Sequence, residues 1–433
     1  ESSQPTLNAF KIVTATLARE QAAAADEARA RGEDRPLLGV PILIKDDTDL
    51  AGFPTAFGCV GEFPSMAEDA EVVKRLKEAG AVIIGKTNAC EFGQWPVVGS
   101  AERGYTRNPW SREHTPGGSS GGTSAAVSAG IVAAGMGSDG AGSVRIPAAW
   151  TNLVGIKPQR GRISTYPWRE AFYGLTVNGP LARTVADAAY LLEHSQGQHP
   201  QDVHRPGTVS VFEAASQEPG RLRVGISTKS PVTVLPSTLN PVIERALREI
   251  ARTIEALGHQ VEDRNPGYLP THGLSLITYG MSGIEDWRRV VPDEHLLDER
   301  TRESARNGRI LRRALPMARR LERLAARAVG RTFRDFDVIV APTTAQPPLK
   351  VGAIDTTGGF ATDRIMIGAC PYAWPWNVLG WPGINIPAGF TEDGLPIGVQ
   401  LLGPEGSEPL LVSLAAQLEN ELAWHQHRPD RWW

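Results

Sequence analysis

Two glycine-rich loops carry the residues best suited to nucleophilic chemistry. Between Thr115 and Lys157 the chain reads TPGGSSGGTSAAVSAGIVAAGMGSDGAGSVRIPAAWTNLVGIK, in which glycines flank Ser119 and a second loop of small residues leads into Ser143. Glycine permits conformations and close backbone approaches that other residues disfavour. Consecutive N–H groups in such loops can hold a phosphate or the oxyanion of an acyl-transfer intermediate. Phosphate binding and serine catalysis are therefore the two chemistries to compare.

The spacing favours serine catalysis. A phosphate loop of the GxxxxGK[ST] type carries a lysine directly after its glycines, and none follows here until Lys157. Residues 117–121 match GxSxG, the nucleophile elbow of α/β-hydrolases, with Ser119 as the nucleophile. That fold also needs a histidine, and none of the nine histidines lies in a setting typical of a catalytic loop. A serine in this chain therefore needs another base.

Lys45 ends the apolar run GVPILI and is the alternative base. A lysine that burial keeps neutral can accept a proton from a serine, because desolvation disfavours the ammonium form. The end of a strand also lies beside the loops that bind ligands in α/β sheets. Taken alone, the residue is more typical of an ion pair with Asp46 or Asp47. Both interpretations stay open at this point.

Short apolar runs bounded by Gly or Pro alternate with longer helical patterns, which predicts an α/β fold. We expect one large, mixed, mostly parallel twisted sheet with helices on both faces. The expected strands are 39–44, 81–85, 153–156, 223–227, 337–341, 383–387 and 398–402. The expected helices are 69–79, 241–257 and a buried helix within 124–137.

No linker or repeat divides the chain, so residues 1–433 are interpreted as one domain. Residues 285–334 are crowded with Arg and Glu at helical spacing, which predicts a peripheral helical insertion. A solvated face with ion pairs one helical turn apart explains these charges more simply than a partner or anion site does.

Composition bears on several classes of protein. Hydrophobic residues make up 41% and charged residues 21%, as in ordinary globular proteins, and the net charge of -3 gives no sign of nucleic-acid binding. No stretch is long enough to suggest a membrane span. Three widely spaced cysteines fit neither a disulfide framework nor a zinc site and favour a cytoplasmic location. We expect no metal, cofactor, nucleic acid or membrane, and a homodimer stays open.

The chain resembles the amidase signature family in a series of motifs that occur in that family's order and spacing. They are GVPILIKDD, GKTNACEFG, NPW followed by PGGSSGG, SDGAGSVRIPA and VGIKPQRGRIS, with further similarity in DVIVAPTTAQPP and PWNVLGWPGINIPAGF. The resemblance covers nearly the whole chain and implies the family's fold, with the first helix missing here.

The resemblance implies a catalytic triad of Ser143, Ser119 and Lys45. The family's relay serine lies in a cis peptide within GGSSGG, and its nucleophile follows 24 residues later, which is the spacing from Ser119 to Ser143. Ser143 would attack an amide carbonyl while Ser119 passes its proton to Lys45. The oxyanion would be held by the backbone N–H groups of Gly140, Ala141, Gly142 and Ser143. The family commonly has Thr-Gly-Gly where this chain has Gly-Ala-Gly before the nucleophile.

The resemblance also assigns supporting residues and two substrate contacts. Ser120, Asp139 and Arg145 match positions that would hold the catalytic loops, and Gln94 and Trp95 follow GKTN in a loop that the family places near the substrate. The tryptophan-rich C-terminal loop adds Trp376 and Trp381 as expected substrate contacts. These tryptophans favour a small to medium apolar or aryl acyl group, although core packing is the other explanation for large aromatics.

Two other functions stay open beside a free amidase. One is the glutaminase subunit of a tRNA-dependent amidotransferase, which shares the fold. Such subunits typically carry glutamine after the Ile-Arg that follows the nucleophile, whereas this chain has Val144-Arg145-Ile146. The other is a ligand-binding pseudoenzyme, against which the presence of all three catalytic residues argues.

Overall fold

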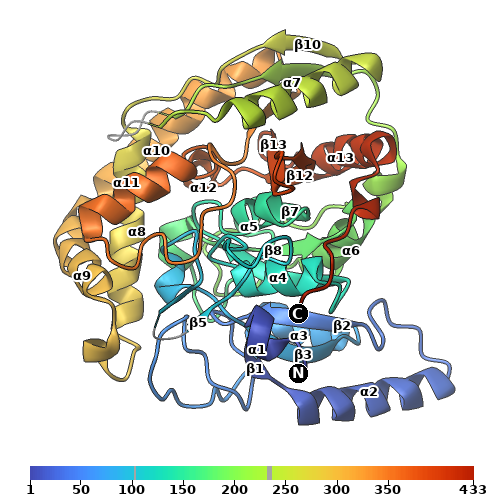
Figure 1. Ribbon diagram of the computed structural model, residues 1–433, viewed down its shortest axis with the longest axis vertical. Helices are drawn as coiled ribbons and strands as arrows, with labels where there is room; N and C mark the ends of the chain where they lie inside the picture. The colour runs from blue at the N-terminus through green and yellow to red at the C-terminus, as the bar shows by residue number, and fades with distance from the viewer. Residues whose placement is uncertain (102–103, 232–236) are drawn as a thin grey trace.

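An eight-stranded mixed sheet forms the centre of the protein (Figure 1). The computed structural model describes residues 1–101, 104–231 and 237–433. In spatial order the strands are β10 (Gln260–Asp263), β9 (Arg223–Ile226), β11 (Val338–Pro342), β13 (Pro396–Leu402), β12 (Gly383–Phe390), β7 (Val154–Lys157), β8 (Val177–Ala182) and β6 (Ala134–Asp139).

The predicted large mixed sheet is confirmed, but its mostly parallel pairing is wrong. Within this sheet, β9 pairs in parallel with β10 and β11, whereas the neighbours from β11 through β6 pair antiparallel. The turn between β12 and β13 is too short for a crossover, so these strands must run antiparallel. Strands buried on both faces show the same apolar runs in either direction, so the sequence pattern could not set the pairing.

Lys45 lies in a second, three-stranded sheet and not in the large one. β2 (Pro41–Lys45) pairs in parallel with β3 (Val82–Thr87), which pairs antiparallel with β1 (Phe10–Val13). Figure 1 shows this sheet, in blue, below the large one. β2 contacts β6, so the two sheets meet beside Lys45. β4 (Gly99–Ser100) and β5 (Gly104–Tyr105) form a short antiparallel pair.

Helices cover both faces of the large sheet. α6, α7 and α13 bury apolar side chains against one face, and α4 and α5 pack on the other. The α-helices are α1 (Gln4–Leu7), α2 (Ala15–Ala30), α3 (Glu71–Glu78), α4 (Gly121–Ser128), α5 (Arg145–Trp150), α6 (Val185–Ser195), α7 (Pro241–Ala256), α8 (His272–Arg288), α9 (Glu299–Leu311), α10 (Leu315–Gly330), α11 (Gly359–Ala369), α12 (Pro375–Leu379) and α13 (Glu408–Leu422). Short 3-10 helices are η1 (Glu91–Gly93), η2 (Ala171–Gly174), η3 (Glu213–Ser216), η4 (Glu294–Leu296), η5 (Arg312–Ala314), η6 (Thr332–Arg334) and η7 (Trp424–Gln426).

Local sequence signals explain α7 but not the end of α4. In α7 the Asn240 side chain accepts from the Val242 N–H, and Pro241 occupies the first turn, where its missing N–H costs nothing. The helix expected within 124–137 is wrong beyond Ser128. Gly130, at φ +77°, ends the helical course, and β6 begins at Ala134. Alanine and glycine occur in buried helices and buried strands alike, so composition alone could not separate them.

Residues 285–334 form the end of α8 together with α9 and α10, at one side of the sheets (Figure 1). The Glu285 carboxylate lies 2.8 Å from Arg288, 3.3 Å from Arg289 and 3.4 Å from Arg309. Ion pairs one turn apart thus account for part of the charge in this segment. The segment also walls the cavity described below, which the sequence interpretation did not foresee.

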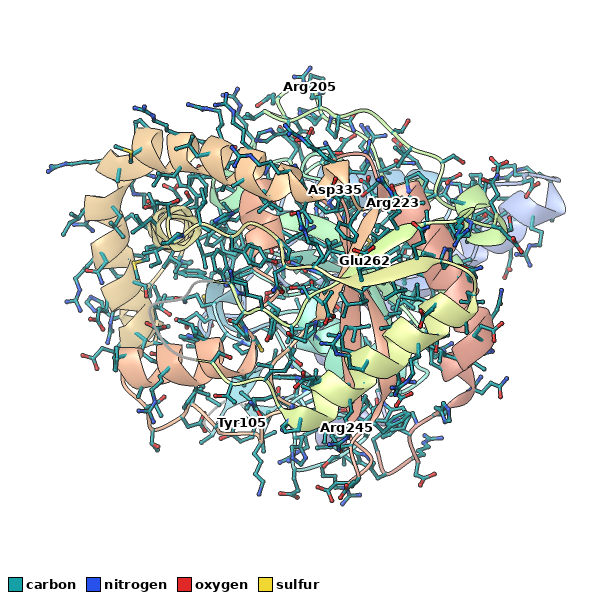
Figure 2. The ribbon with its side chains drawn as sticks, turned by 90° about the horizontal axis from the view of Figure 1, so that it is seen from above. Tyr105, Arg205, Arg223, Arg245, Glu262 and Asp335 are labelled. Carbon is teal, nitrogen blue, oxygen red and sulfur yellow. The ribbon has the colours of Figure 1, made fainter. Side chains whose placement is uncertain are left out.

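Charged side chains line the open edge of the large sheet, where β10 is the outer strand. Figure 2 shows Arg223, Glu262 and Asp335 at this edge, and all three are exposed. Charges on an edge strand disfavour pairing with a second chain. Across the described residues, no helix is long and apolar enough to cross a membrane.

Candidate active site

Lys45 is buried at the end of β2 and contacts two serines and a carboxylate. Its Nζ donates to Ser119 Oγ at 2.6 Å and to Ser138 Oγ at 2.7 Å. Asp47 Oδ2 lies 3.0 Å from the same nitrogen. The side chain is 1% exposed, because the apolar strand carries it into the junction of the two sheets. Lys45 thus forms the expected ion pair, although with Asp47 alone, and it also lies within hydrogen-bond reach of Ser119, as the interpretation as a base requires.

Ser119 occupies the loop before α4, and its peptide bond with Gly118 is cis. A Cβ at Gly118 would lie 2.5 Å from the Trp95 carbonyl oxygen, so the close backbone approach requires glycine there. Ser120 joins the two serine loops, because its N–H donates to the Ser143 carbonyl oxygen at 3.2 Å and its hydroxyl to the Ser138 carbonyl oxygen at 3.1 Å.

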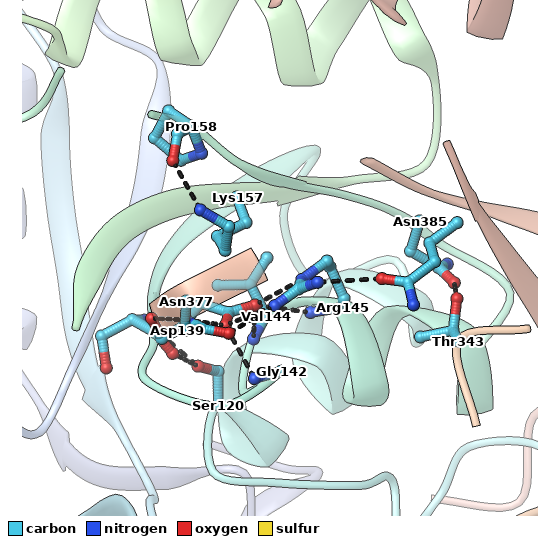
Figure 3. Close-up of polar contacts among 12 residues, drawn as sticks. Ser120, Asp139, Gly142, Val144, Arg145, Lys157, Pro158, Thr343, Asn377 and Asn385 are labelled. Atoms are coloured by element: carbon cyan, nitrogen blue, oxygen red, sulfur yellow. Dashed lines mark hydrogen bonds and ion pairs between the residues drawn. The ribbon is translucent and has the colours of Figure 1, made fainter. Parts of the chain in front are cut away.

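Ser143 follows β6 in a loop that is organised around the buried Asp139 carboxylate (Figure 3). Asp139 accepts hydrogen bonds from the N–H groups of Gly142 at 2.7 Å and Val144 at 3.2 Å. The Arg145 guanidinium donates to both carboxylate oxygens at 3.0 Å. Burial alone would raise the pKa of Asp139, but the Arg145 charge and hydrogen bonds hold it well below its ordinary value. Asp139 therefore stays ionised and fixes the loop.

The geometry corrects the predicted set of oxyanion donors. The Gly142 N–H turns inward to Asp139 and Gly142 does not line the cavity, so it is not available to an oxyanion. Gly140, Ala141 and Ser143 do line the cavity, and within the described residues their N–H groups have no hydrogen-bond acceptor. Gly142 adopts φ +120°, a conformation that favours glycine. This inward turn was not visible in the run of small residues.

A cavity of about 450 Å³ opens over Ser119, Ser138, Ser143 and Asp47. Most of its other walls are apolar and come from η1, η2 with the residue after it, α8 and α11. These side chains are Phe92, Phe172, Leu175, Leu276, Ile277, Met281, Ile284, Trp287, Phe360 and Met366. No histidine lines the cavity, and all nine histidines are among the described residues. The cavity therefore combines three serines beside the Lys45–Asp47 pair with a largely apolar interior.

The predicted substrate contacts divide into two groups. Gln94 and Trp95 line the cavity. The Gln94 amide donates to Thr301 Oγ1 at 2.8 Å, and the Arg300 guanidinium lies 4.5 Å from the Trp95 ring centroid. These contacts hold both side chains against α9 at the cavity wall.

The placement of Trp376 and Trp381 at the substrate is wrong. Trp376 is 0% and Trp381 7% exposed, and neither lines the cavity. They pack with Tyr268, Phe333 and other residues of an apolar cluster beneath α10. Core packing, the other explanation weighed for these tryptophans, accounts for their positions, because large aromatics gain most when fully removed from water.

Sequence reasoning missed Ser138 and most of the apolar wall. Ser138 directly precedes Asp139 at the end of β6, so its place in the SDGAGSVRIPA motif was the signal that could have identified it. The apolar positions of α8 gave no such signal, since apolar helix faces usually belong to the core. Among the described residues, no group of three or more His, Cys, Asp or Glu side chains could hold a metal ion.

The family model described as Amidase matches residues 1–412. The chain therefore belongs to the amidase signature family and is an amide-hydrolysing enzyme. A Mycobacterium tuberculosis protein named as amidase AmiA2 is 54% identical over 432 residues, which cover 100% of this chain and 89% of the relative. A glutamyl-tRNA(Gln) amidotransferase subunit from Pseudomonas syringae is 35% identical, with 98% of this chain and 92% of the relative covered. A solved 6-aminohexanoate cyclic dimer hydrolase is 31% identical, with a TM-score of 0.89, covering 99% of this chain and 92% of that one.

Proposed function

We propose that the enzyme hydrolyses a small to medium apolar or aryl carboxylic acid amide through an acyl-enzyme on Ser143. The observation that carries this proposal is the 2.6 Å contact between Lys45 Nζ and Ser119 Oγ, because Ser119 lines the same cavity as Ser143. A buried lysine within hydrogen-bond reach of a serine can act as its base when it is neutral. The N–H groups of Gly140, Ala141 and Ser143 at the cavity supply donors for the developing oxyanion.

The proposed cycle keeps every proton within this relay. Neutral Lys45 takes a proton from Ser119, which takes one from Ser143 as the Ser143 oxygen attacks the amide carbonyl. Ser119 then returns a proton to the nitrogen as the C–N bond breaks, and the amine leaves. Water next attacks the acyl-enzyme through the same relay, releasing the acid and restoring Ser143.

A fluorophosphonate probe tests the nucleophile. The probe should label Ser143, and mass spectrometry of the digested protein should locate it there. Ser143→Ala should abolish labelling and amide hydrolysis, while Ser111→Ala, a serine outside the cavity, should leave both unchanged. Labelling of another serine, or persistent hydrolysis by Ser143→Ala, would contradict the proposal.

The apolar wall formed by η1, η2, α8 and α11 supports an apolar acyl or aryl group in the substrate. The similarity to a 6-aminohexanoate cyclic dimer hydrolase is consistent with an amide of medium size. A panel of primary and aryl amides with short, medium and aromatic acyl groups tests this class. Preference for glutamine would instead favour the glutaminase role in a tRNA-dependent amidotransferase, whose sequence similarity to this chain is lower. The cytoplasmic location and the homodimer stay predictions.

A further inference from the structure

The Asp47 carboxylate is the third polar group in contact with Lys45 Nζ, beside the hydroxyls of Ser119 and Ser138. Its Oδ2 is 3.0 Å from Lys45 Nζ and accepts the Ser138 hydroxyl at 2.5 Å. We infer that Asp47, with Ser138, is a positioning residue that orients Lys45 and stabilises its charged form during proton transfer. This inference rests on the proposed Ser143 mechanism and extends it from three residues to five.

The direction of the hydrogen bonds supports an orienting role. An ionised carboxylate only accepts, so the Ser138 hydroxyl gives its hydrogen to Asp47 and turns its lone pairs to Lys45. Ser138 can then only accept from Lys45 Nζ, at 2.7 Å. One N–H of the amine is thereby directed to Ser138, which restricts rotation about the Cε–Nζ bond. A neutral amine held in this way can direct its lone pair to Ser119.

Ser138 is itself held by the catalytic loops. Its N–H donates to Ser120 Oγ at 3.2 Å, and its carbonyl oxygen accepts the Ser120 hydroxyl at 3.1 Å. Ser120 also contacts the backbone of Ser143. The orienting pair and the nucleophile loop therefore share one support, so that Lys45 keeps a fixed position relative to both serines.

Charge supplies the second part of the inference. When Lys45 takes the Ser119 proton, an ammonium forms on a side chain that is 1% exposed. An unpaired buried charge is strongly unfavourable, whereas a carboxylate in contact offsets much of that cost. The proton returns from Lys45 to Ser119 when the amine leaves. The arrangement matches the general pattern of a nucleophile, a base and a third group that orients the base.

The neighbouring titratable groups do not duplicate this role. The Asp46 carboxylate lies 3.3 Å from Lys86 and accepts the N–H groups of Ala56 and Gly58. Burial raises the pKa of the Cys90 thiol to about 11, so it is neutral at ordinary pH. Within the described residues, Asp47 is the carboxylate in ion-pair contact with Lys45.

The test measures fluorophosphonate inactivation of the full chain, which needs no identified substrate. Asp47→Asn should lower kinact by about 10²- to 10⁴-fold, the range of a lost base, with KI little changed. In this variant the acidic limb of the plot of kinact against pH should move to lower pH, because the Lys45 ammonium loses its counter-charge. Asp47→Glu should recover part of kinact. Ser138→Ala should lower kinact at least about tenfold without moving that limb, because the carboxylate remains.

Asp26→Asn, the same substitution on the exposed face of α2, is the matched control and should leave both constants unchanged. Circular dichroism and the thermal midpoint establish that each variant is folded. If Asp47→Asn does not fold, Ser138→Ala and Asp47→Glu decide the question. A wild-type kinact and pH profile in folded Asp47→Asn, or a wild-type kinact in Ser138→Ala, would overturn the inference. If the probe does not label Ser143 in the wild type, the proposed function itself is refuted.

Discussion

Lys157 gives a stability prediction that is independent of catalysis. It ends β7 in the core and is 0% exposed, and its Nζ donates to the Pro158 carbonyl oxygen at 2.9 Å (Figure 3). Burial, together with the nearby Arg145 charge, lowers the pKa of Lys157 to about 7, while the Asp139 charge opposes part of the change. In the unfolded chain the pKa of this lysine returns to its ordinary value of 10.5.

The sign follows from proton binding. Between pH 7 and 10.5 the unfolded chain holds a proton on Lys157 that the folded chain lacks, so the free energy of unfolding rises with pH in that window. Below pH 7 both states are protonated and the full penalty for burying the charge remains. A pKa fall from 10.5 to about 7 corresponds to a penalty on the order of 5 kcal/mol.

Lys157→Met tests this reasoning, because methionine has an unbranched side chain of similar length and carries no charge. At pH 7 the Met variant should be more stable than the wild type by several kcal/mol, and the difference should shrink as the pH rises towards 10. Urea unfolding of the wild type and the variant across this range measures the difference directly. Lys74→Met, an exposed lysine on α3, should show no comparable trend. Parallel stability curves for the wild type and Lys157→Met would refute the reasoning.

Three further predictions concern the catalytic loops and the tryptophans. Asp139→Asn should lower the free energy of unfolding by about 3 to 5 kcal/mol, because Arg145 is left as an uncompensated buried charge; urea unfolding measures the loss. Gly142→Ala should slow fluorophosphonate labelling at least about tenfold. Its φ of +120° disfavours Ala, and the new Cβ would lie 2.6 Å from the Cβ of Ala373. An unchanged labelling rate would contradict the loop geometry. Trp376→Ala should cost about 3 to 5 kcal/mol of stability with KM unchanged, whereas Trp95→Ala should raise KM; the reverse pattern in thermal and kinetic assays would exchange their roles.

The sequence by itself was sufficient to mark Ser119, Ser143 and Lys45 as candidates, and the resemblance to the amidase signature family gave them their expected roles. Glycine and serine in fixed order mark loops with close backbone approaches, and an apolar run marks a buried strand with a polar residue at its end. The same local signals predicted seven strands to within a few residues, but they missed β1, β6, β8 and β10. These features depend on neighbours in the chain, which is why a single sequence can reveal them.

Only the tertiary structure decided which buried residues meet. Trp376 and Trp95 are both aromatic residues near motif sequences, yet one lies in the core and the other at the cavity. The inward turn of the Gly142 N–H depends on the placement of a carboxylate. The contact of Lys45 with Ser138 joins two different sheets across 93 residues of chain. Periodicity and composition report that a side chain is buried but not what it is buried against, because that choice depends on how distant elements pack.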